Sequence, residues 1–100
     1  MRNLTTETKE EIRKLIYDFF AEECEVELDE LNDETNISDD LDGDSLLFVE
    51  LVELLKKKYD LNIQLQTIGK YLLKSPAETI GEVAATSYMI YEHENDIINL

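Results

Sequence analysis

The sequence predicts an all-α protein, a four-helix bundle with three main helices, one short third helix and a long first loop. Three stretches repeat apolar residues at the three- and four-residue spacing of a helix. We find no two-residue alternation of the kind that marks an amphipathic strand. The chain has 100 residues, which is enough for one domain with a small core. We therefore expect residues 1–100 to form a single domain.

The first helix is predicted to begin near Thr6. Glu7, Glu10 and Glu11 load its first turns with negative charge, which suits the positive end of the helix dipole. The apolar stripe that follows is expected to face the core and comprises Ile12, Leu15, Ile16, Phe19 and Phe20.

Residues 24–44 read as a long ordered loop. The helical periodicity fades there, and the composition shifts to Asp, Glu and Asn. Cys24, the only cysteine, cannot form an internal disulfide and is expected to be a buried or half-buried free thiol. The residues expected to anchor this loop to the core are Val26, Leu28, Leu31, Ile37 and Leu41.

A second helix is predicted from Leu46 to Tyr59, with Asp44 or Ser45 as its N-cap. On a helical wheel its inward face comprises Phe48, Leu51, Val52, Leu55 and Tyr59, flanked by Leu47 and Leu54. The opposite face carries Leu46, Glu50, Glu53 and Lys57, with Val49 alongside. Apolar residues thus occur on the polar face only near Ser45, a combination that suits a docking surface.

Residues 64–74 predict a third, less regular helix, with Gly69 as a point where the chain could bend or be approached closely. Ser75-Pro76 ends it. A fourth helix should run from Ala77 or Glu78 to Tyr91 or Glu92, with Ile80, Val83, Ala84, Ser87, Tyr88 and Tyr91 facing inward. The last residues, 93–100, should fray or add a helical turn, and His93 is expected to be exposed and without a role.

The net charge of −15 argues against nucleic acid or an anionic membrane as a partner and favours basic protein surfaces. The sequence has no apolar run of membrane-spanning length and no signal-peptide pattern at its start, so a cytoplasmic location is expected. The acidic loop imitates a calcium-binding EF-hand, but Ser38, Leu46 and Val49 occupy the first, ninth and twelfth positions. No metal site is expected.

Ser45 stands where the acidic loop enters the second helix. A phosphate ester there would be stabilised by the helix dipole and by unpaired backbone N–H groups. Gly43 removes a side chain just upstream and would leave room for a large group. His93 is the only histidine, in a terminal segment, so Ser45 lacks a base and no catalytic residue is expected. Ser45 is therefore a better candidate to receive a group from another enzyme than to act as a nucleophile by itself. A role as a helix cap alone would also explain a serine at this position.

Residues 42–46, Asp-Gly-Asp-Ser-Leu, followed by Val49-Glu50-Leu51-Val52, resemble the serine motif of acyl carrier proteins. The resemblance covers most of the chain, including Thr79-Ile80-Gly81-Glu82-Val83 at the start of the last helix. It implies that Ser45, with Gly43 and Asp44, is the attachment site of a phosphopantetheine arm that carries acyl groups as thioesters, in fatty-acid, polyketide or related lipid biosynthesis. The partners implied are a phosphopantetheinyl transferase and acyl-transferring and ketosynthase-type enzymes with basic docking surfaces. The docking residues implied are Leu46, Val49, Glu50 and Glu53, on a monomer.

Two alternatives share these observations. One is a carrier of an aminoacyl or aryl cargo, of the peptidyl or D-alanyl carrier type, and the other is a helical adaptor or calcium-responsive module in which Ser45 is only a cap. Lys56-Lys57-Lys58 and the apolar residues of segment 64–76 depart from the usual family pattern. Two interpretations of these departures are open. The lysines compensate the dipole at the end of the helix and the apolar residues complete a small core, or both mark a specialised carrier whose third helix helps to shape the cargo cavity.

Overall fold

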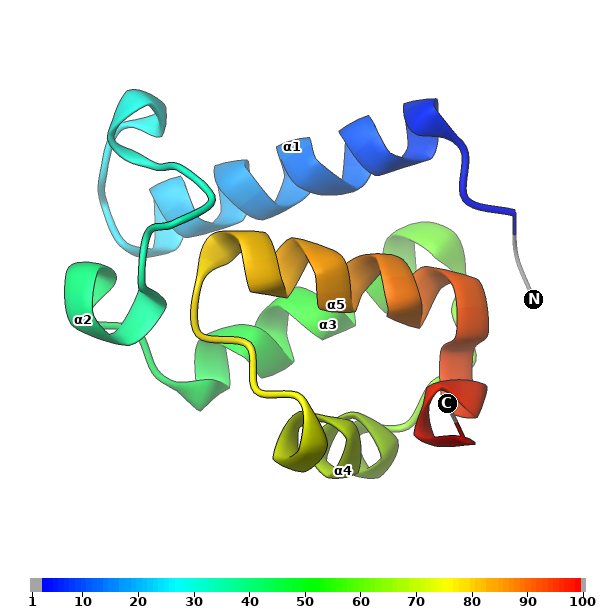
Figure 1. Ribbon diagram of the computed structural model, residues 1–100. Coiled ribbons are helices and arrows are strands. Elements are labelled where there is room, and N and C mark those ends of the chain that lie inside the picture. Colours follow the sequence, from blue (N-terminus) through cyan, green and yellow to red (C-terminus); the bar gives the residue numbers. More distant parts are fainter. Residues whose placement is uncertain (1–2, 100) are drawn as a thin grey trace.

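A computed structural model describes residues 3–99, apart from the side chain of Ser45. The predicted all-α class is confirmed: two of the main helices run side by side, the third crosses behind one of them, and a shorter helix lies at one side (Figure 1). The helices in chain order are α1 (Thr6–Glu23), α2 (Ile37–Leu41), α3 (Ser45–Tyr59), α4 (Leu65–Lys74) and α5 (Ile80–His93). Two 3-10 helices, η1 (Leu28–Glu30) and η2 (Glu94–Asn99), complete the fold.

One apolar cluster from α1, α3 and α5 forms the core, as the helical periodicity predicts. The side chains of Ile12, Ile16, Phe20, Leu51, Val52, Ile80, Val83 and Ile90 are fully buried in it. Each such side chain contributes about 1.5–3 kcal/mol through burial. Of the predicted inward residues of α3, Phe48 and Tyr59 are only half-buried, and Leu54 on the flank is exposed. Of those of α5, Tyr88 and Tyr91 are half-buried, whereas Thr86 and Ile90 are buried without having been predicted.

Hydrogen bonds at the helix starts decide where the helices begin. Asp44 is the cap of α3, so this helix starts at Ser45, one residue before the predicted start. The last helix, α5, begins at Ile80, two or three residues after the prediction, because Thr79 forms a capping box with Glu82. Thr79 Oγ1 accepts a hydrogen bond from the Glu82 N–H at 3.2 Å, and Glu82 Oε1 accepts one from the Thr79 N–H at 3.1 Å. The hydrogen bonds that the Glu82 carboxylate accepts from the Thr79 and Glu78 N–H groups lower the pKa of Glu82.

The long loop between α1 and α3 contains more helix than the sequence predicted. The five-residue helix α2 is capped by Asn36, whose Oδ1 accepts a hydrogen bond from the Asp39 N–H at 2.9 Å. Leu31 is buried, and Val26, Ile37 and Leu41 pack against the core as expected. The prediction for Leu28 was wrong, because this side chain lies in η1 and is 51% exposed.

Backbone hydrogen bonds attach this loop to the start of α5. The Ile37 N–H donates to the Glu78 carbonyl at 2.9 Å, and the Ile80 N–H donates to the Thr35 carbonyl at 3.0 Å. The Gly81 N–H donates to the Asp33 carbonyl at 2.9 Å, and a Cβ at Gly81 would lie only 2.9 Å from the same oxygen. Glycine at position 81 therefore allows the loop to approach the helix closely.

Side chains of α1 hold the same loop from its other side. Asp33 Oδ1 accepts hydrogen bonds from Arg13 Nη2 and Tyr17 Oη, each at 2.6 Å. Desolvation and the bond to Asp33 raise the pKa of Tyr17 to about 12, while the bonds from Arg13 and Tyr17 lower the pKa of Asp33. The loop is thus held between α1 and α5, which fixes the position of α2.

The predicted third helix is confirmed as α4, a continuous ten-residue helix rather than a less regular one. The close approach expected at Gly69 does not occur, since a Cβ added there would meet nothing within 4 Å. The predicted last turn is present as η2, with Ile97 1% exposed. His93 was expected to be exposed, but it is half-buried at the end of α5. Leu100 lies outside the described residues.

Candidate functional site

The site predicted from the sequence lies at the start of α3. Ser45 is the first residue of this helix, directly after the cap Asp44, and its side chain lies outside the described part of the structure. Asp44 Oδ1 accepts a hydrogen bond from the Leu46 N–H at 3.0 Å, and the Asp44 carboxylate is exposed. Position 45 therefore stands at the positive end of a fifteen-residue helix.

Gly43 joins α2 to α3 through a close contact. Its N–H donates to the Ile37 carbonyl at 2.8 Å. An added Cβ would lie 2.7 Å from Ile37 Cγ2 and 2.8 Å from Leu47 Cδ1. The sequence-based reason for this glycine therefore needs correction, because the space that it leaves is filled by these two side chains. Because Gly43 has no side chain, α2 can pack directly against the start of α3.

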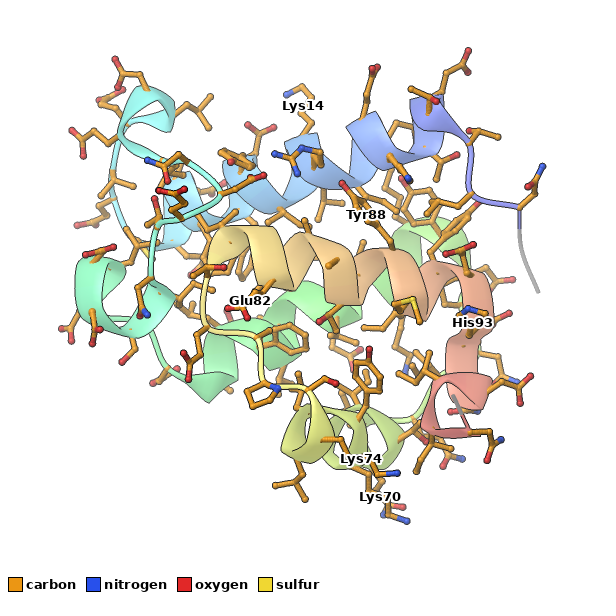
Figure 2. All side chains as sticks on the ribbon, viewed as in Figure 1. Lys14, Lys70, Lys74, Glu82, Tyr88 and His93 are labelled. Carbon is orange, nitrogen blue, oxygen red and sulfur yellow. The ribbon has the colours of Figure 1, made fainter. Side chains whose placement is uncertain are left out.

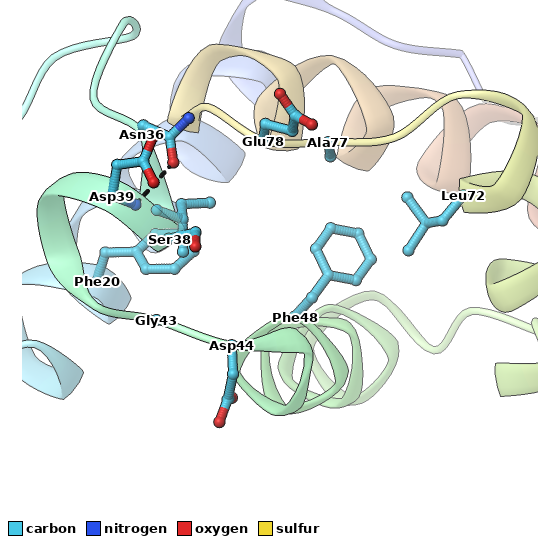
Figure 3. A pocket seen from close by; sticks show the side chains of 11 residues that line it. Phe20, Asn36, Ser38, Asp39, Gly43, Asp44, Phe48, Leu72, Ala77 and Glu78 are labelled. Carbon is cyan, nitrogen blue, oxygen red and sulfur yellow. Dashed lines mark hydrogen bonds between the residues drawn. The ribbon is translucent and has the colours of Figure 1, made fainter.

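A cavity of about 450 Å³ opens beside this junction (Figure 3). Its apolar wall includes Phe20, Phe48 and Leu72, and in the close-up the side chains of Phe48 and Leu72 lie opposite each other. The rest of the lining is Asn36, Ile37, Ser38, Asp39, Gly43, Asp44, Ala77 and Glu78. The volume falls within the range of sites that hold small ligands.

Only one of the apolar residues predicted to face the cargo from the third helix lines this cavity. That residue is Leu72. Ile68 is buried in the core instead, while Leu65 and Leu73 are 43% and 86% exposed. Tyr71 is half-buried and packs against the core. The segment therefore contributes to the cavity through a single side chain.

The predicted docking residues line a different hollow, between α1 and α3. Val49, Glu50 and Glu53 line a groove of about 760 Å³, whereas Leu46 is not part of its lining and is 60% exposed. The groove is completed by Glu11, Lys14, Leu15, Asp18, Phe19, Glu22, Glu23, Leu54 and Lys58. The contribution of α1 was missed because a helical wheel describes one helix without its neighbours.

The groove has an acidic rim and an apolar floor. Six of its lining residues are Asp or Glu and two are Lys. Lys14 Nζ already binds Asp18 Oδ2 at 2.7 Å, and Lys58 Nζ lies 5.6 Å from the centre of the Tyr59 ring. Leu15, Phe19, Val49 and Leu54 supply the apolar surface. Such a surface suits a partner that presents an apolar side chain among cations.

The lysines that depart from the family pattern are at the end of α3, and α4 carries two further lysines. Lys56 Nζ lies 4.0 Å from Glu53 Oε1, and Lys57 and Lys58 are exposed at the end of α3. Lys70 and Lys74 project together from the outer side of α4 (Figure 2). Lys56 is thus close to Glu53, one of the predicted docking residues.

Three further features bear on function: the single thiol, a possible metal site and a possible membrane span. Cys24 is a half-buried free thiol, as predicted, and burial raises its pKa. Within residues 3–99, no group of three or more His, Cys, Asp and Glu residues is arranged to hold a metal ion. Over the same residues, no helix is long and apolar enough to span a bilayer.

Comparison with known proteins indicates the family of this chain. The family model described as "Phosphopantetheine attachment site" matches residues 14–86. An "Acyl carrier protein homolog" of Clostridium acetobutylicum is 66% identical over 100 residues, which cover this whole chain and 97% of that protein. An "Acyl carrier protein" of Lactobacillus johnsonii is 36% identical over 69 residues, 63% of this chain and 86% of the relative. An "Acyl carrier protein" of Chlorobium luteolum is 39% identical over 56 residues, 56% of this chain and 72% of the relative. No solved structure matches.

The family match covers the start of α3, both walls of the cavity and about half of each of α1 and α5. Members of this family carry a covalently attached phosphopantetheine group and work with a phosphopantetheinyl transferase and biosynthetic enzymes. The chain belongs to the acyl carrier protein family.

Proposed function

We propose that Ser45 carries the phosphopantetheine arm and that the chain transports acyl groups for fatty-acid, polyketide or related lipid biosynthesis. One observation carries the proposal: position 45 opens α3 directly after Asp44, beside a cavity with an apolar wall. The arm supplies a terminal thiol on which an acyl group is held as a thioester. The chain itself supplies no catalytic group in this proposal.

The residues around position 45 fit a phosphate ester. The first N–H groups of a helix have no partner within the helix, and here they are combined with the positive end of the helix dipole. The Asp44 carboxylate binds the Leu46 N–H at 3.0 Å, which leaves its other oxygen for a transferase or for a metal ion bound to that enzyme. Gly43 keeps α2 packed closely against the helix start, so this end of α3 is held in place.

The cavity is the proposed shelter for the cargo. Phe20, Phe48 and Leu72 offer apolar surface, and burying each methylene of an acyl chain there gains about 0.8 kcal/mol. Asn36, Ser38 and Asp39 lie on another wall, and the Asn36 side chain is already bonded to the backbone of Asp39. The apolar wall favours an acyl chain over an aminoacyl cargo, whose amine would find no partner on that side.

The groove between α1 and α3 is the proposed docking surface for partner enzymes. Glu50 and Glu53 stand on its α3 side and Glu22 stands on its α1 side, so a basic helix or loop that lies in it would meet carboxylates on both sides. Val49 and Leu54 give this partner an apolar contact. Leu46, which lies outside the groove, is proposed as a separate contact nearer to Ser45.

The attachment proposal is tested by intact-mass measurement after co-expression with a broad-specificity phosphopantetheinyl transferase. The wild-type chain should gain the mass of one arm, and Ser45→Ala should gain none. Ser38→Ala is the matched control, because Ser38 is exposed and lines the same cavity, and it should be modified like the wild type. An unmodified wild type with several such transferases, or a modified Ser45→Ala, would contradict the proposal.

A further inference from the structure

The C-terminal segment η2 holds the connection that leads into α4. Asn95 Oδ1 accepts a hydrogen bond from the Gln64 N–H at 2.9 Å, and Glu94 Oε2 accepts one from the Asn62 N–H. Gln64 is the residue that precedes α4 and has no side-chain cap of its own. The tail lies beside this end of α4 in Figure 1. Two side chains of the tail therefore satisfy backbone N–H groups at the entry to α4.

The same segments also pack against each other, since η2 lies against α4. Ile97 is 1% exposed and belongs to the buried cluster that contains Ile63, which is 2% exposed, and Ile68, which is 4% exposed. Ile68 is the buried residue of α4. Leu65 and Leu73 of this helix point to solvent, and Gly69 meets nothing within 4 Å. Few side chains attach α4 to the rest of the molecule, so the tail supplies an important part of that attachment.

The chain turns sharply to bring the tail to this position. Glu94 has a φ of 49°, a positive value that a residue with a side chain adopts only at a cost in free energy. Its N–H donates to the Ile90 carbonyl and ends α5 there. The contacts that follow the turn, made by Asn95 and Ile97, offset this cost and keep η2 folded back on α4.

The position of α4 in turn affects the cavity beside Ser45. Leu72 is the α4 residue on the cavity wall, and it lies opposite Phe48 of α3 (Figure 3). We propose that the C-terminal tail is a strap that holds α4 in place and thereby fixes the width of the cavity between Leu72 and Phe48. Asn95 and Ile97 are then positioning residues that determine which cargo the cavity shelters. The strap stands on the contacts described, whereas its effect on cargo rests on the proposed function.

Hydrogen exchange of the chain without its arm tests the strap by itself. Asn95→Ala should accelerate exchange of the α4 amides about fivefold, which corresponds to the loss of one net hydrogen bond. Asn99→Ala, at an exposed position of the same segment, is the matched control and should leave α4 unchanged. Ile97→Ala should accelerate hydrogen exchange of the α4 amides about thirtyfold or more. Ile98→Ala, at a half-buried position, should change this exchange only slightly. Exchange of α4 at the wild-type rate in both Asn95→Ala and Ile97→Ala would overturn the strap.

The link to the cavity has its own measurement. With an octanoyl group loaded on the arm, Asn95→Ala should speed thioester hydrolysis in parallel with α4 exchange, and Asn99→Ala should not. Faster α4 exchange with unchanged hydrolysis would overturn the claim that the tail fixes the cavity width. Failure of Ser45 to accept the arm would contradict the proposed function, but it would leave the hydrogen-exchange result valid.

Discussion

Asp33 connects three parts of the chain that are distant in sequence. Its carboxylate binds Arg13 and Tyr17 of α1, and its carbonyl accepts the Gly81 N–H of α5. The loop that ends in α2 is therefore tied to α1 and α5 through one residue. Because α2 forms a wall of the cavity, Asp33 supports the site from a distance.

The lowered pKa of Asp33 predicts an acid-sensitive contribution to stability. A group whose pKa is lower in the folded state stabilises the fold above its ordinary pKa, 3.8, and loses this effect as the pH falls through the folded value. Asp33→Asn should reduce the free energy of unfolding at neutral pH by less than about 1 kcal/mol, since the ion pair is half-exposed. It should also flatten the loss of stability below about pH 4. Urea titrations across this pH range measure both effects.

The control for this prediction is Asp29→Asn, an exposed carboxylate in η1 of the same loop. Its stability curve should keep the wild-type shape. If Asp33→Asn and Asp29→Asn give the same curve, the bonds from Arg13 and Tyr17 do not stabilise the fold.

Leu72 and Leu73 offer a matched pair for the cargo cavity. Leu72 lines the cavity, whereas its neighbour Leu73 is 86% exposed. Leu72→Ala should speed hydrolysis of a loaded acyl thioester by a thioesterase about tenfold, because lost apolar contact favours the chain outside the cavity. Leu73→Ala should hydrolyse at the wild-type rate. Equal hydrolysis rates for Leu72→Ala and the wild type would show that α4 does not help to shelter the acyl chain.

At the scale of the elements, α1 and α3 together form the proposed docking groove, so charges on both helices should matter. Glu22→Gln combined with Glu50→Gln should raise the KM of the phosphopantetheinyl transferase several-fold, with a smaller effect at high salt. The kcat should change little, since neither residue lies beside Ser45 in the cavity lining.

Glu27→Gln combined with Glu30→Gln removes the same charge from an exposed part of the first loop and serves as the control. An equal effect of both pairs would mean that net charge alone, rather than the groove, attracts the enzyme. The same comparison can be made for apolar contact, with Leu54→Asn in the groove and Leu28→Asn in the first loop as its control. The two side chains are similarly exposed, at 43% and 51%.

The elements also show what the sequence could and could not predict. The 3.6-residue periodicity found the buried faces of α1, α3 and α5, because burial of an apolar stripe is what stabilises these helices. The helix α2 escaped prediction because five residues are too few to show a period, and its cap Asn36 lies in a run of polar residues. The first loop is attached to α5 by backbone hydrogen bonds, which do not depend on particular side chains and are therefore hard to predict from the sequence. Gly81 inside a predicted helix was the one available signal.

For the site, the motif around Ser45 predicted the start of the helix to within one residue, and Asp44 is one of the two caps that it allowed. The groove and the cavity could not be predicted in the same way, because each is formed by residues of several elements whose relative positions depend on packing. The tail was expected to fray or add a turn, and the burial of Ile97 depends on a reversal at Glu94 that no local pattern indicates.

The whole molecule carries a large excess of negative charge. Fifteen of its acidic residues lie between Lys14 and Lys56, an interval without any basic residue. Repulsion among them should lower stability at low ionic strength, where the screening length is about 30 Å at 0.01 M and 10 Å at 0.1 M. The melting temperature should therefore rise by several degrees between these salt concentrations, as measured by circular dichroism. A constant or falling melting temperature would contradict this, and saturable submicromolar calcium binding would favour the calcium-responsive alternative.

The central claim is that acyl cargo is held on an arm at Ser45, and tandem mass spectrometry of the acylated protein tests it most directly. The chain would be loaded from an acyl-coenzyme A by a transferase and fragmented intact. We predict that fragments containing residue 45 carry the mass of the arm with its acyl group, and that fragments ending before it do not. An acyl group located on Ser38, Cys24 or any other residue, or the absence of an acylated arm, would contradict the account.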